Sequence, residues 1–397
     1  MLLVDDPTTL WRHRDSYDLR GLLLANLRHV HGLQYLNGAE IAEASNYLRG
    51  QLREYANQHS PAYRDRPGIV SKRDLQNKTD WYVEGVPFQA ASTSGSTGTH
   101  FHYRRWAESF QTIEANLHYR AILHEYQIKC QNLVYLMLDQ PVTPKAIRTH
   151  QTNNLVMSHG LRTAVTVHEF SRSPLYYKDS NRFWGEIITY CQELNPEVIL
   201  IRGDLLATFR WNCERLGVAT PLCQLLSHTG AKARLDDFTT LHKMGAIGQW
   251  CDHMRCWDGG VTFFTCPYRT YHLLDGLAAV STDDHRLVST DFYSLASPFI
   301  DYWNGDFATI GAEYERCQCG RSYRSLDRSR SRLLTGVTNT EIRQRIIESG
   351  VDTSLLLRGE ARDRFLRLFT SRQLPQVQRE TIRRLLPDLV LDFVVEQ

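Results

Sequence analysis

The sequence predicts an α/β fold, with a large N-terminal domain of parallel-rich sheets flanked by helices plus a β subdomain, and a small C-terminal α+β domain. Between residues 130 and 250, short apolar runs such as NLVYLML alternate with segments of helical period such as FWGEIITYCQEL, which indicates a largely parallel sheet. Residues 260–310 form short strand-rich segments, which is typical of a β subdomain. The length of 397 residues fits two domains of unequal size.

The remaining elements follow from the same periodic patterns. Residues 17–60 carry apolar positions three and four apart, which predicts helices. The extended run at 101–104 alternates like a strand, and 106–126 has the pattern of a long helix. Residues after about 337 are Arg-rich and predict helix, whereas the last apolar run, 388–395, predicts a strand.

Composition excludes several classes of protein. Hydrophobic residues make up 42% and charged residues 23%, which is the balance of a globular chain that buries a sizeable core. The net charge is only +2, so we expect no nucleic-acid partner and no membrane surface. The N-terminus has three apolar residues before two aspartates, and we therefore expect neither a signal peptide nor an anchor. Nine scattered cysteines, an odd number, argue against a disulfide framework and favour the cytoplasm.

A cluster of hydroxyls and glycines at 92–99 is the most specific local signal. Gly95 and Gly98 allow tight turns that present backbone N–H groups, and the surrounding hydroxyls add donors that suit phosphate oxygens. The cluster lacks the Gly-Lys-Ser/Thr of the nucleoside-triphosphatase loop. A flexible polar hairpin is the other interpretation of the same composition. The candidate phosphate-binding residues are Ser94, Gly95, Ser96, Thr97, Gly98 and Thr99.

This cluster resembles a known signature. Residues 93–99 are similar to the phosphate-binding loop of the adenylate-forming superfamily, and 101–105 are similar to its phenylacetate–coenzyme A ligase-like branch. In compactness the chain is also similar to the indoleacetate–lysine ligases. His100 stands where that superfamily usually has proline. Further landmarks of the superfamily follow in order along the chain.

The resemblance assigns roles to these later landmarks. Thr229 and Gly230 match the adenine-side turn, although Ala231 replaces its glutamate. Asp258 stands where the superfamily has the glutamate that holds Mg²⁺, and Asp306 ends a run whose aspartate grips the ribose hydroxyls. A Cys-Gly-Arg segment at 319–321 and the hinge arginine Arg332 complete the series.

The resemblance implies an ATP-dependent ligase. Residues 1–335 would form the ATP- and carboxylate-binding adenylation domain and 336–397 the small lid. The expected reaction activates a carboxylic acid as an acyl-adenylate, using ATP and Mg²⁺, and passes the acyl group to an amine, with an amino acid favoured. The catalytic residues implied are Thr97, Asp258 and Arg332. An aromatic content of 11% favours an aromatic acid.

Two alternatives stay open. A thiol acceptor such as coenzyme A is the nearer one, although the C-terminal segment of about 60 residues is short for such a lid. A degenerate fold that binds nucleotide without turnover is the other. The superfamily's C-terminal lysine has no match, since the last lysine of the chain is Lys243, and arginine would bind phosphate with a different geometry. The loop at 94–99 and Asp306 favour catalysis.

A separate group of residues suggests zinc. Cys266 and His272 lie six residues apart, and Cys317 and Cys319 form a Cys-x-Cys pair. Three cysteines and one histidine make an acceptable tetrahedral zinc set, and thiolates favour zinc over magnesium. The resemblance supports such a site, because some members of the branch carry one. Buried free cysteines are the alternative interpretation.

Overall fold

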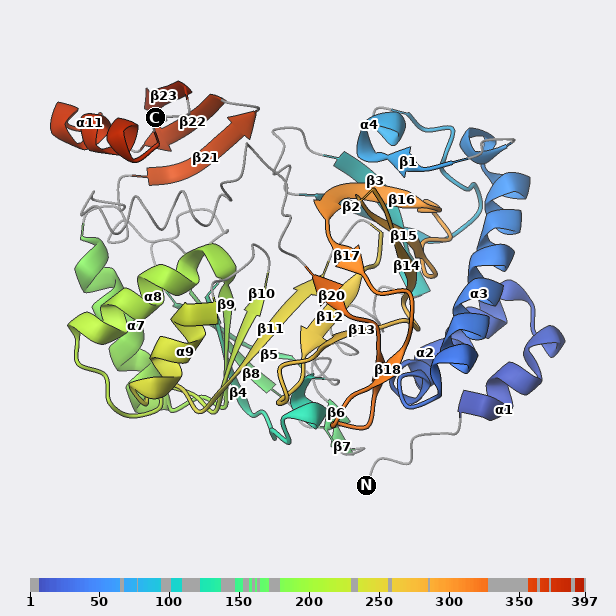
Figure 1. The fold of residues 1–397 in the computed structure, drawn as a ribbon, viewed down its shortest axis with the longest axis horizontal. Coiled ribbons are helices and arrows are strands. Elements are labelled where there is room, and N and C mark those ends of the chain that lie inside the picture. Colours follow the sequence, from blue (N-terminus) through green and yellow to red (C-terminus); the bar gives the residue numbers. More distant parts are fainter. Residues whose placement is uncertain are drawn as a thin grey trace.

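In the computed structural model, the elements arrange around one large sheet (Figure 1). The N-terminal helices lie on the right of that view and the C-terminal strands at the upper left. The structure describes residues 7–64, 68–76, 78–93, 101–108, 122–136, 147–152, 157–158, 161–162, 165–170, 179–229, 235–255, 259–284, 286–327, 356–362, 365–370, 373–386 and 390–395.

The N-terminal region is helical, as its apolar period predicts. Its helices are α1 (Pro7–Arg12), α2 (Leu19–Leu33), α3 (Gly38–His59) and α4 (Lys72–Leu75), with short 3₁₀ helices at Arg14–Ser16 and Pro61–Tyr63. A capping box starts α3, because Asn37 Oδ1 accepts the Glu40 N–H and the Glu40 side chain accepts the Asn37 N–H, both at 3.0 Å. The buried residues of α3, from Ile41 to Ala56, recur every three or four positions, so one face packs into the core.

The large sheet has eight strands in the order β13-β12-β11-β10-β9-β4-β8-β5. These strands are β4 (Asn132–Leu136), β5 (Ile147–Thr152), β8 (Val165–Phe170), β9 (Val198–Arg202), β10 (Leu225–Thr229), β11 (Gln249–Arg255), β12 (Thr262–Thr265) and β13 (Tyr271–Leu273). β8, β4, β9, β10 and β11 are parallel, whereas β5, β12 and β13 join antiparallel. Counted along the chain, the parallel strands lie in the order 2-1-3-4-5, which places a topological switch point between β4 and β9.

Both faces of the central strands are buried, which explains the apolar runs within β4 and β9. α7 (Ser180–Leu194), α8 (Gly203–Arg215) and α9 (Leu235–Lys243) cover one face, where Ile199, Leu226 and Trp250 join their core. The opposite face supplies alternate residues such as Val198 and Leu225 to a second core shared with α2 and α3.

A smaller sheet and several hairpins complete the elements described up to residue 327. The smaller sheet has the order β1-β16-β15-β14, and β2 pairs with β3 in a hairpin. The bounds are β1 (Val70–Ser71), β2 (Phe88–Thr93), β3 (Phe101–Trp106), β6 (Met157–Ser158), β7 (Leu161–Arg162), β14 (Ala278–Asp283), β15 (Arg286–Asp291), β16 (Tyr302–Phe307), β17 (Thr309–Ile310), β18 (Glu315–Arg316), β19 (Ser322–Tyr323) and β20 (Leu326–Asp327).

The C-terminal part mixes strands with a helix. It consists of β21 (Leu356–Arg362), β22 (Phe365–Thr370), α11 (Gln376–Leu385) and β23 (Val390–Val395), and the three strands form one sheet. The predicted terminal strand is confirmed. The expectation of helix throughout the earlier part is wrong, because 356–370 forms a β-hairpin whose second strand pairs in parallel with β23. Short apolar runs fit either period, and here tertiary pairing decides.

Other expectations meet the structure with mixed results. The strand and helix alternation over 130–250 and the strand-rich 260–310 are confirmed. Most of the helix predicted at 106–126 lies outside the described residues, as does the predicted boundary at 335/336. The part of the chain that the structure describes contains no helix long and apolar enough to cross a membrane.

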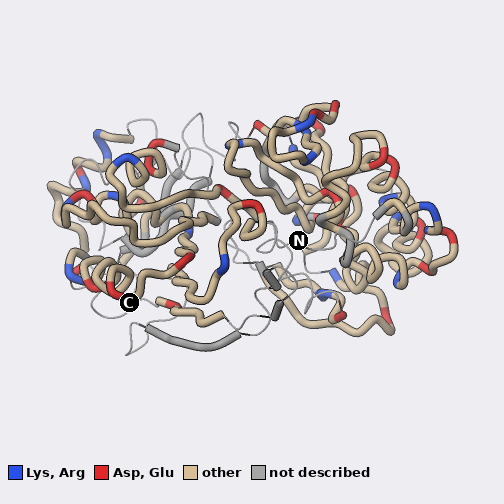
Figure 2. Tube along the Cα trace, turned by 90° about the horizontal axis from the view of Figure 1, so that it is seen from below, with Lys and Arg blue, Asp and Glu red and all other residues tan. Residues whose placement is uncertain are grey.

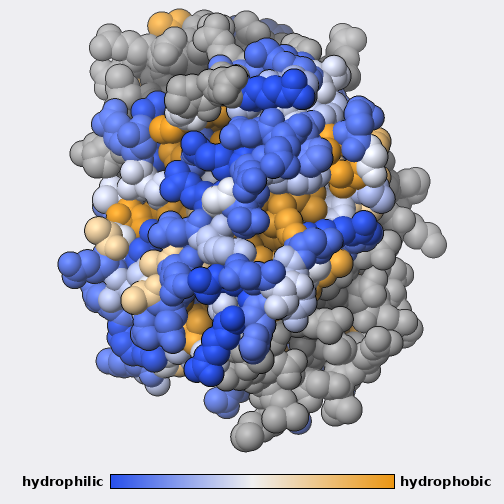
Figure 3. All heavy atoms as spheres, turned by 90° about the vertical axis from the view of Figure 1, so that its right-hand side faces the viewer, coloured by the Kyte–Doolittle hydropathy of each residue, from blue (hydrophilic) through white to orange (hydrophobic). Residues whose placement is uncertain are grey.

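Charges and hydrophobic side chains are dispersed over the described surface. Basic and acidic residues are interspersed over the trace in Figure 2, in keeping with the net charge of +2. On the side that carries α1 to α3, hydrophilic side chains dominate and hydrophobic ones show in small patches between them (Figure 3). This distribution is usual for the water-facing surface of a folded protein.

Candidate functional site

The predicted phosphate loop connects the two strands of a hairpin. β2 and β3 pair antiparallel up to Thr93 and Phe101, so residues 94–100 leave and re-enter at one end of this ribbon. The base of the hairpin is packed: Phe101 is buried and stacks on Trp81 with ring centroids 5.6 Å apart. Ser94, Gly95, Ser96, Thr97, Gly98 and Thr99 lie outside the described residues.

Two other predicted site segments leave the same edge of the large sheet. β10 ends at Thr229 and β11 ends at Arg255, and the two strands are parallel neighbours. Gly230 and Asp258 follow these ends and lie outside the described residues. In open α/β sheets, ligands bind beyond the carboxyl ends of the strands, near the switch point. The strand ends before these segments thus lie at the carboxyl edge of the sheet, two and three strands from β4, and the roles of Thr229, Gly230 and Asp258 stay predictions.

The remaining predicted nucleotide residues are placed only in part. Asp306 lies in β16 of the smaller sheet, and the structure describes its backbone but not its side chain. Arg332 lies outside the described residues. The roles assigned to these two residues stay predictions.

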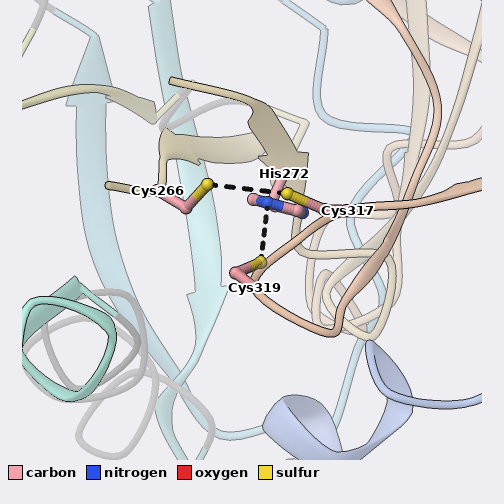
Figure 4. A group of neighbouring side chains, drawn as sticks. All are labelled: Cys266, His272, Cys317 and Cys319. Carbon is pink, nitrogen blue, oxygen red and sulfur yellow. Dashed lines mark hydrogen bonds between the residues drawn. The ribbon is translucent and has the colours of Figure 1, made fainter. Parts of the chain in front are cut away.

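The four predicted zinc ligands lie together (Figure 4). Their ligand atoms are all within 4.8 Å of one another. Cys266 Sγ lies 3.8 Å from Cys317 Sγ, and Cys319 Sγ lies 3.3 Å from His272 Nε2. The grouping that the sequence pattern suggested is therefore present, although residues up to 53 positions apart contribute to it.

Two tight turns hold these side chains. In the first, between β12 and β13, the Cys266 N–H donates to Thr270 O at 3.0 Å and the Arg269 N–H donates to Cys266 O at 2.8 Å. In the second, between β18 and β19, the Gly320 N–H donates to Cys317 O at 2.9 Å. Gly320 has a φ of +88°, a conformation that glycine adopts without steric cost. The turns thus place one ligand pair opposite the other.

The electrostatics of the cluster favour a thiolate. The hydrogen bond from the Cys319 thiol lowers the pKa of Cys266 to about 3, His272 contributes further, and the same interaction raises the pKa of Cys319. His272 Nδ1 is buried without a hydrogen-bond partner among the described residues, and packing against Phe264 and Tyr323 holds the ring. Three soft sulfurs and one imidazole nitrogen are a donor set that fits zinc.

A buried ion pair supports the second turn. Arg321, which follows the Cys-Gly pair, is 1% exposed, and its Nε–H donates to Glu125 at 2.8 Å. Its guanidinium also lies over the rings of Tyr35 and Phe264, and its backbone carbonyl accepts the Cys317 N–H. The turn is thus tied to the core by charge and stacking.

Sequence reasoning missed a second buried polar cluster, at the ends of β10 and β11. His228 Nδ1 lies 2.8 Å from Asp252 Oδ1, Tyr271 donates its hydroxyl to the other oxygen of Asp252, and Ser227 Oγ lies 3.0 Å from His253 Nδ1. The signal in the sequence was a histidine near the end of each of two neighbouring strands. Only the pairing of these strands shows that the side chains meet.

The architecture described above is shared with solved structures of an acyl-CoA ligase. Among solved structures, one of 2-hydroxyisobutyryl-CoA ligase in the postadenylation state with R3-HIB-AMP is similar to this chain at 13% identity and a TM-score of 0.56, covering 92% of this chain and 87% of that one. An open conformation of the same ligase with 2-HIB-AMP and CoA gives 12% identity and a TM-score of 0.55, covering 89% and 93%. No family model and no curated protein matches the sequence. These likenesses confirm the predicted fold class and the fold that the motifs implied.

Proposed function

We propose that this chain is an ATP-dependent ligase that activates a carboxylic acid as an acyl-adenylate and transfers the acyl group to an amine, with an amino acid as the favoured acceptor. One observation carries the proposal. Motifs that resemble those of adenylate-forming enzymes follow one another in the expected order in a chain whose fold is similar to that of a ligase solved in complex with R3-HIB-AMP. Within that fold, the hydroxyl-rich loop joins β2 and β3, and two further motifs follow β10 and β11. An aromatic acid is the favoured substrate, because aromatic residues make up 11% of the chain.

The first half-reaction joins two anions. A carboxylate oxygen of the acid attacks the α-phosphorus of ATP, and the bond to the β-phosphate oxygen breaks, releasing pyrophosphate. The loop from Ser94 to Thr99 supplies N–H and hydroxyl donors to the phosphates, with Thr97 among them. Asp258 would hold Mg²⁺, since a carboxylate oxygen suits this hard cation, and the ion would supply positive charge against the phosphates.

The rest of the nucleotide is held by other segments. Thr229 and Gly230 form the adenine side of the site and Asp306 accepts hydrogen bonds from the ribose hydroxyls. Arg332 acts at the hinge between domain 1–335 and lid 336–397. In the second half-reaction the acceptor nitrogen attacks the acyl carbon, AMP leaves with the electrons of its bond, and the nitrogen loses a proton.

A thiol acceptor is a second candidate. The solved neighbour has been captured with 2-HIB-AMP and CoA in its thioesterification state, and that structure covers 89% of this chain. In that case a thiolate sulfur would replace the amine nitrogen as the nucleophile. The two candidates share the first half-reaction and differ only in the second.

ATP–pyrophosphate exchange across a panel of aromatic, aliphatic and amino-bearing acids tests the proposal. We expect one class of acid to drive exchange and Asp306→Ala to abolish it. Asp283→Ala is the matched control, because Asp283 lies in the same sheet and pairs only with exposed Arg286 among the described residues. Adding amines or coenzyme A then identifies the acceptor. Absence of exchange with every acid, with ATP still binding in calorimetry, would instead identify a degenerate nucleotide-binding fold.

We also propose that Cys266, His272, Cys317 and Cys319 bind a structural zinc ion. Their donor chemistry, their spacing and the low pKa of Cys266 support this assignment. Four protein ligands leave no open position for substrate, so the ion would tie the β12–β13 turn to the β18–β19 turn. Elemental analysis of the purified chain is expected to give about one zinc ion per chain.

A further inference from the structure

The last registered pair between β10 and β11 is joined through its side chains. Pairing of these strands runs from Leu225 and Gln249 to His228 and Asp252, although β10 continues to Thr229 and β11 continues further. Both side chains of the last pair are buried, and their nitrogen and oxygen lie 2.8 Å apart. This hydrogen bond therefore links the strands at the point where their backbone pairing stops.

A third residue connects this pair to the turn that carries Cys266 and His272. Tyr271, the neighbour of His272 in β13, donates its hydroxyl to Asp252 Oδ2. The same turn makes a second contact with β11. Arg269, with a φ of +64°, lies over the Trp250 ring at 3.7 Å and donates to Trp250 O at 2.6 Å.

The hydrogen bonds among Tyr271, Asp252 and His228 constrain the positions of these three side chains. An ionised carboxylate only accepts hydrogen bonds, so Asp252 holds His228 in the tautomer that carries its proton on Nδ1. One carboxylate oxygen of Asp252 contacts the imidazole and the other accepts from the phenol. The Asp252 backbone N–H is also used, because it donates to Thr265 Oγ1 at 2.9 Å. Side chain and backbone are therefore both constrained.

The free-energy balance indicates that these buried polar residues position the strand ends rather than stabilise the fold. Burying a carboxylate and an imidazole has a large desolvation cost, and well-packed apolar residues at such positions are often equally or more stabilising. The best-attested use of buried polar groups is to fix register. Here the register in question is that of two strand ends, from which the proposed adenine-side turn and the proposed magnesium loop leave.

We infer that Tyr271, Asp252 and His228 form a positioning chain that fixes the carboxyl ends of β10 and β11 and couples them to the Cys266–His272 turn. Its catalytic consequence rests on the proposed function. The mechanical coupling between the turn and the strand ends does not. None of the three side chains is assigned to the nucleotide, the acid or the acceptor.

Two variants interrupt this series of side-chain hydrogen bonds at different points. Tyr271→Phe removes one hydroxyl, and Asp252→Asn, which lies outside the Cys/His group, disturbs both bonds of the carboxylate. Tyr126→Phe is the matched control, because the Tyr126 hydroxyl is also buried against this sheet, where it donates to Trp250 O and Thr265 O. It removes the same atom without touching Asp252.

The first readout is ATP–pyrophosphate exchange by the full chain. Because a displacement of about 1 Å far from the chemistry can cost on the order of a hundred-fold, we expect kcat to fall roughly ten- to a hundred-fold in both variants, with the KM of the acid unchanged. Tyr126→Phe is expected to keep the wild-type kcat. A rise in KM without loss of kcat would overturn the inference, as would equal losses in the control.

The second readout does not depend on activity. Hydrogen–deuterium exchange of the amides in 225–229 and 249–255 is expected to rise in Tyr271→Phe and Asp252→Asn, but not in Tyr126→Phe. If exchange of these amides rises while the wild-type chain shows no pyrophosphate exchange, the proposed function fails and the coupling stands. Unchanged amide exchange in both variants would overturn the coupling itself.

Discussion

The distance between the sulfurs of the Cys/His cluster gives a quantitative test of the zinc proposal. In a regular tetrahedron the edge is about 1.63 times the distance from the centre to a corner, so the separation of 3.8 Å between the sulfurs of Cys266 and Cys317 implies a metal–sulfur distance of about 2.3 Å. That value is the usual zinc–thiolate distance. X-ray absorption of the purified chain is therefore expected to show three sulfurs at about 2.3 Å and one nitrogen at about 2.0 Å.

Cys319→Ser should remove the metal and lower the thermal midpoint. Structural zinc contributes on the order of 10 kcal/mol in zinc-finger peptides, so loss of one thiolate should cost far more than a buried cysteine elsewhere. Cys223→Ser is the control, because Cys223 is fully buried in the core beside α7 and α8, and a buried hydroxyl costs about 1–3 kcal/mol.

Three results would refute this reasoning. One is a wild-type chain that holds no metal and keeps its midpoint in chelator. Another is an absorption spectrum with oxygen in place of sulfur. The third is a Cys319→Ser variant with the stability of Cys223→Ser, since the cluster would then be only a group of buried thiols.

Two further predictions concern buried ionisable groups. Glu125→Ala leaves the guanidinium of Arg321 buried without its carboxylate, so urea denaturation should show that the free energy of unfolding falls by about 3–5 kcal/mol. The control Glu186→Ala, which removes the exposed partner of Arg182, should cost less than about 0.5 kcal/mol. Equal losses in the two variants would contradict this prediction. Burial lowers the pKa of His168, so the unfolded chain takes up a proton at a higher pH than the folded chain does. The free energy of unfolding should therefore fall as pH drops below about 6.5, and it should fall more steeply in wild type than in His168→Gln. Parallel curves for the two proteins would contradict this prediction.

Much of the α/β part of the fold could be predicted from the sequence because its central strands are buried on both faces. In β9, residues 198–201 are apolar without interruption, and the intervening helices carry a clear period of 3.6. The C-terminal hairpin was misassigned because Leu356–Arg362 and Phe365–Thr370 mix apolar and charged residues in a way that fits both periods. Its pairing with the terminal strand, which no local pattern records, decided the outcome.

The same distinction between local sequence pattern and long-range pairing applies to the candidate sites. Cys266 with His272, and Cys317 with Cys319, are close in the sequence, so each pair could be noticed before the structure joined them. The contact between His228 and Asp252 depends on the register of two strands separated by a helix. A shift of one residue would put the two side chains on opposite faces of the sheet, and no motif fixes that register in advance.

The buried polar residues at the ends of β10 and β11 bear on the choice between catalysis and a degenerate fold. His228 and Asp252 meet on the face covered by α9, where His228 contacts Phe238, and Ser227 and His253 meet on the opposite face. Apolar pairs at these positions would hold the strands at a lower desolvation cost. Pairs of this kind fix strand register in a scaffold as well as in an enzyme. Here they lie at the ends of β10 and β11, where we propose that the nucleotide binds, so their position is consistent with the proposed catalysis.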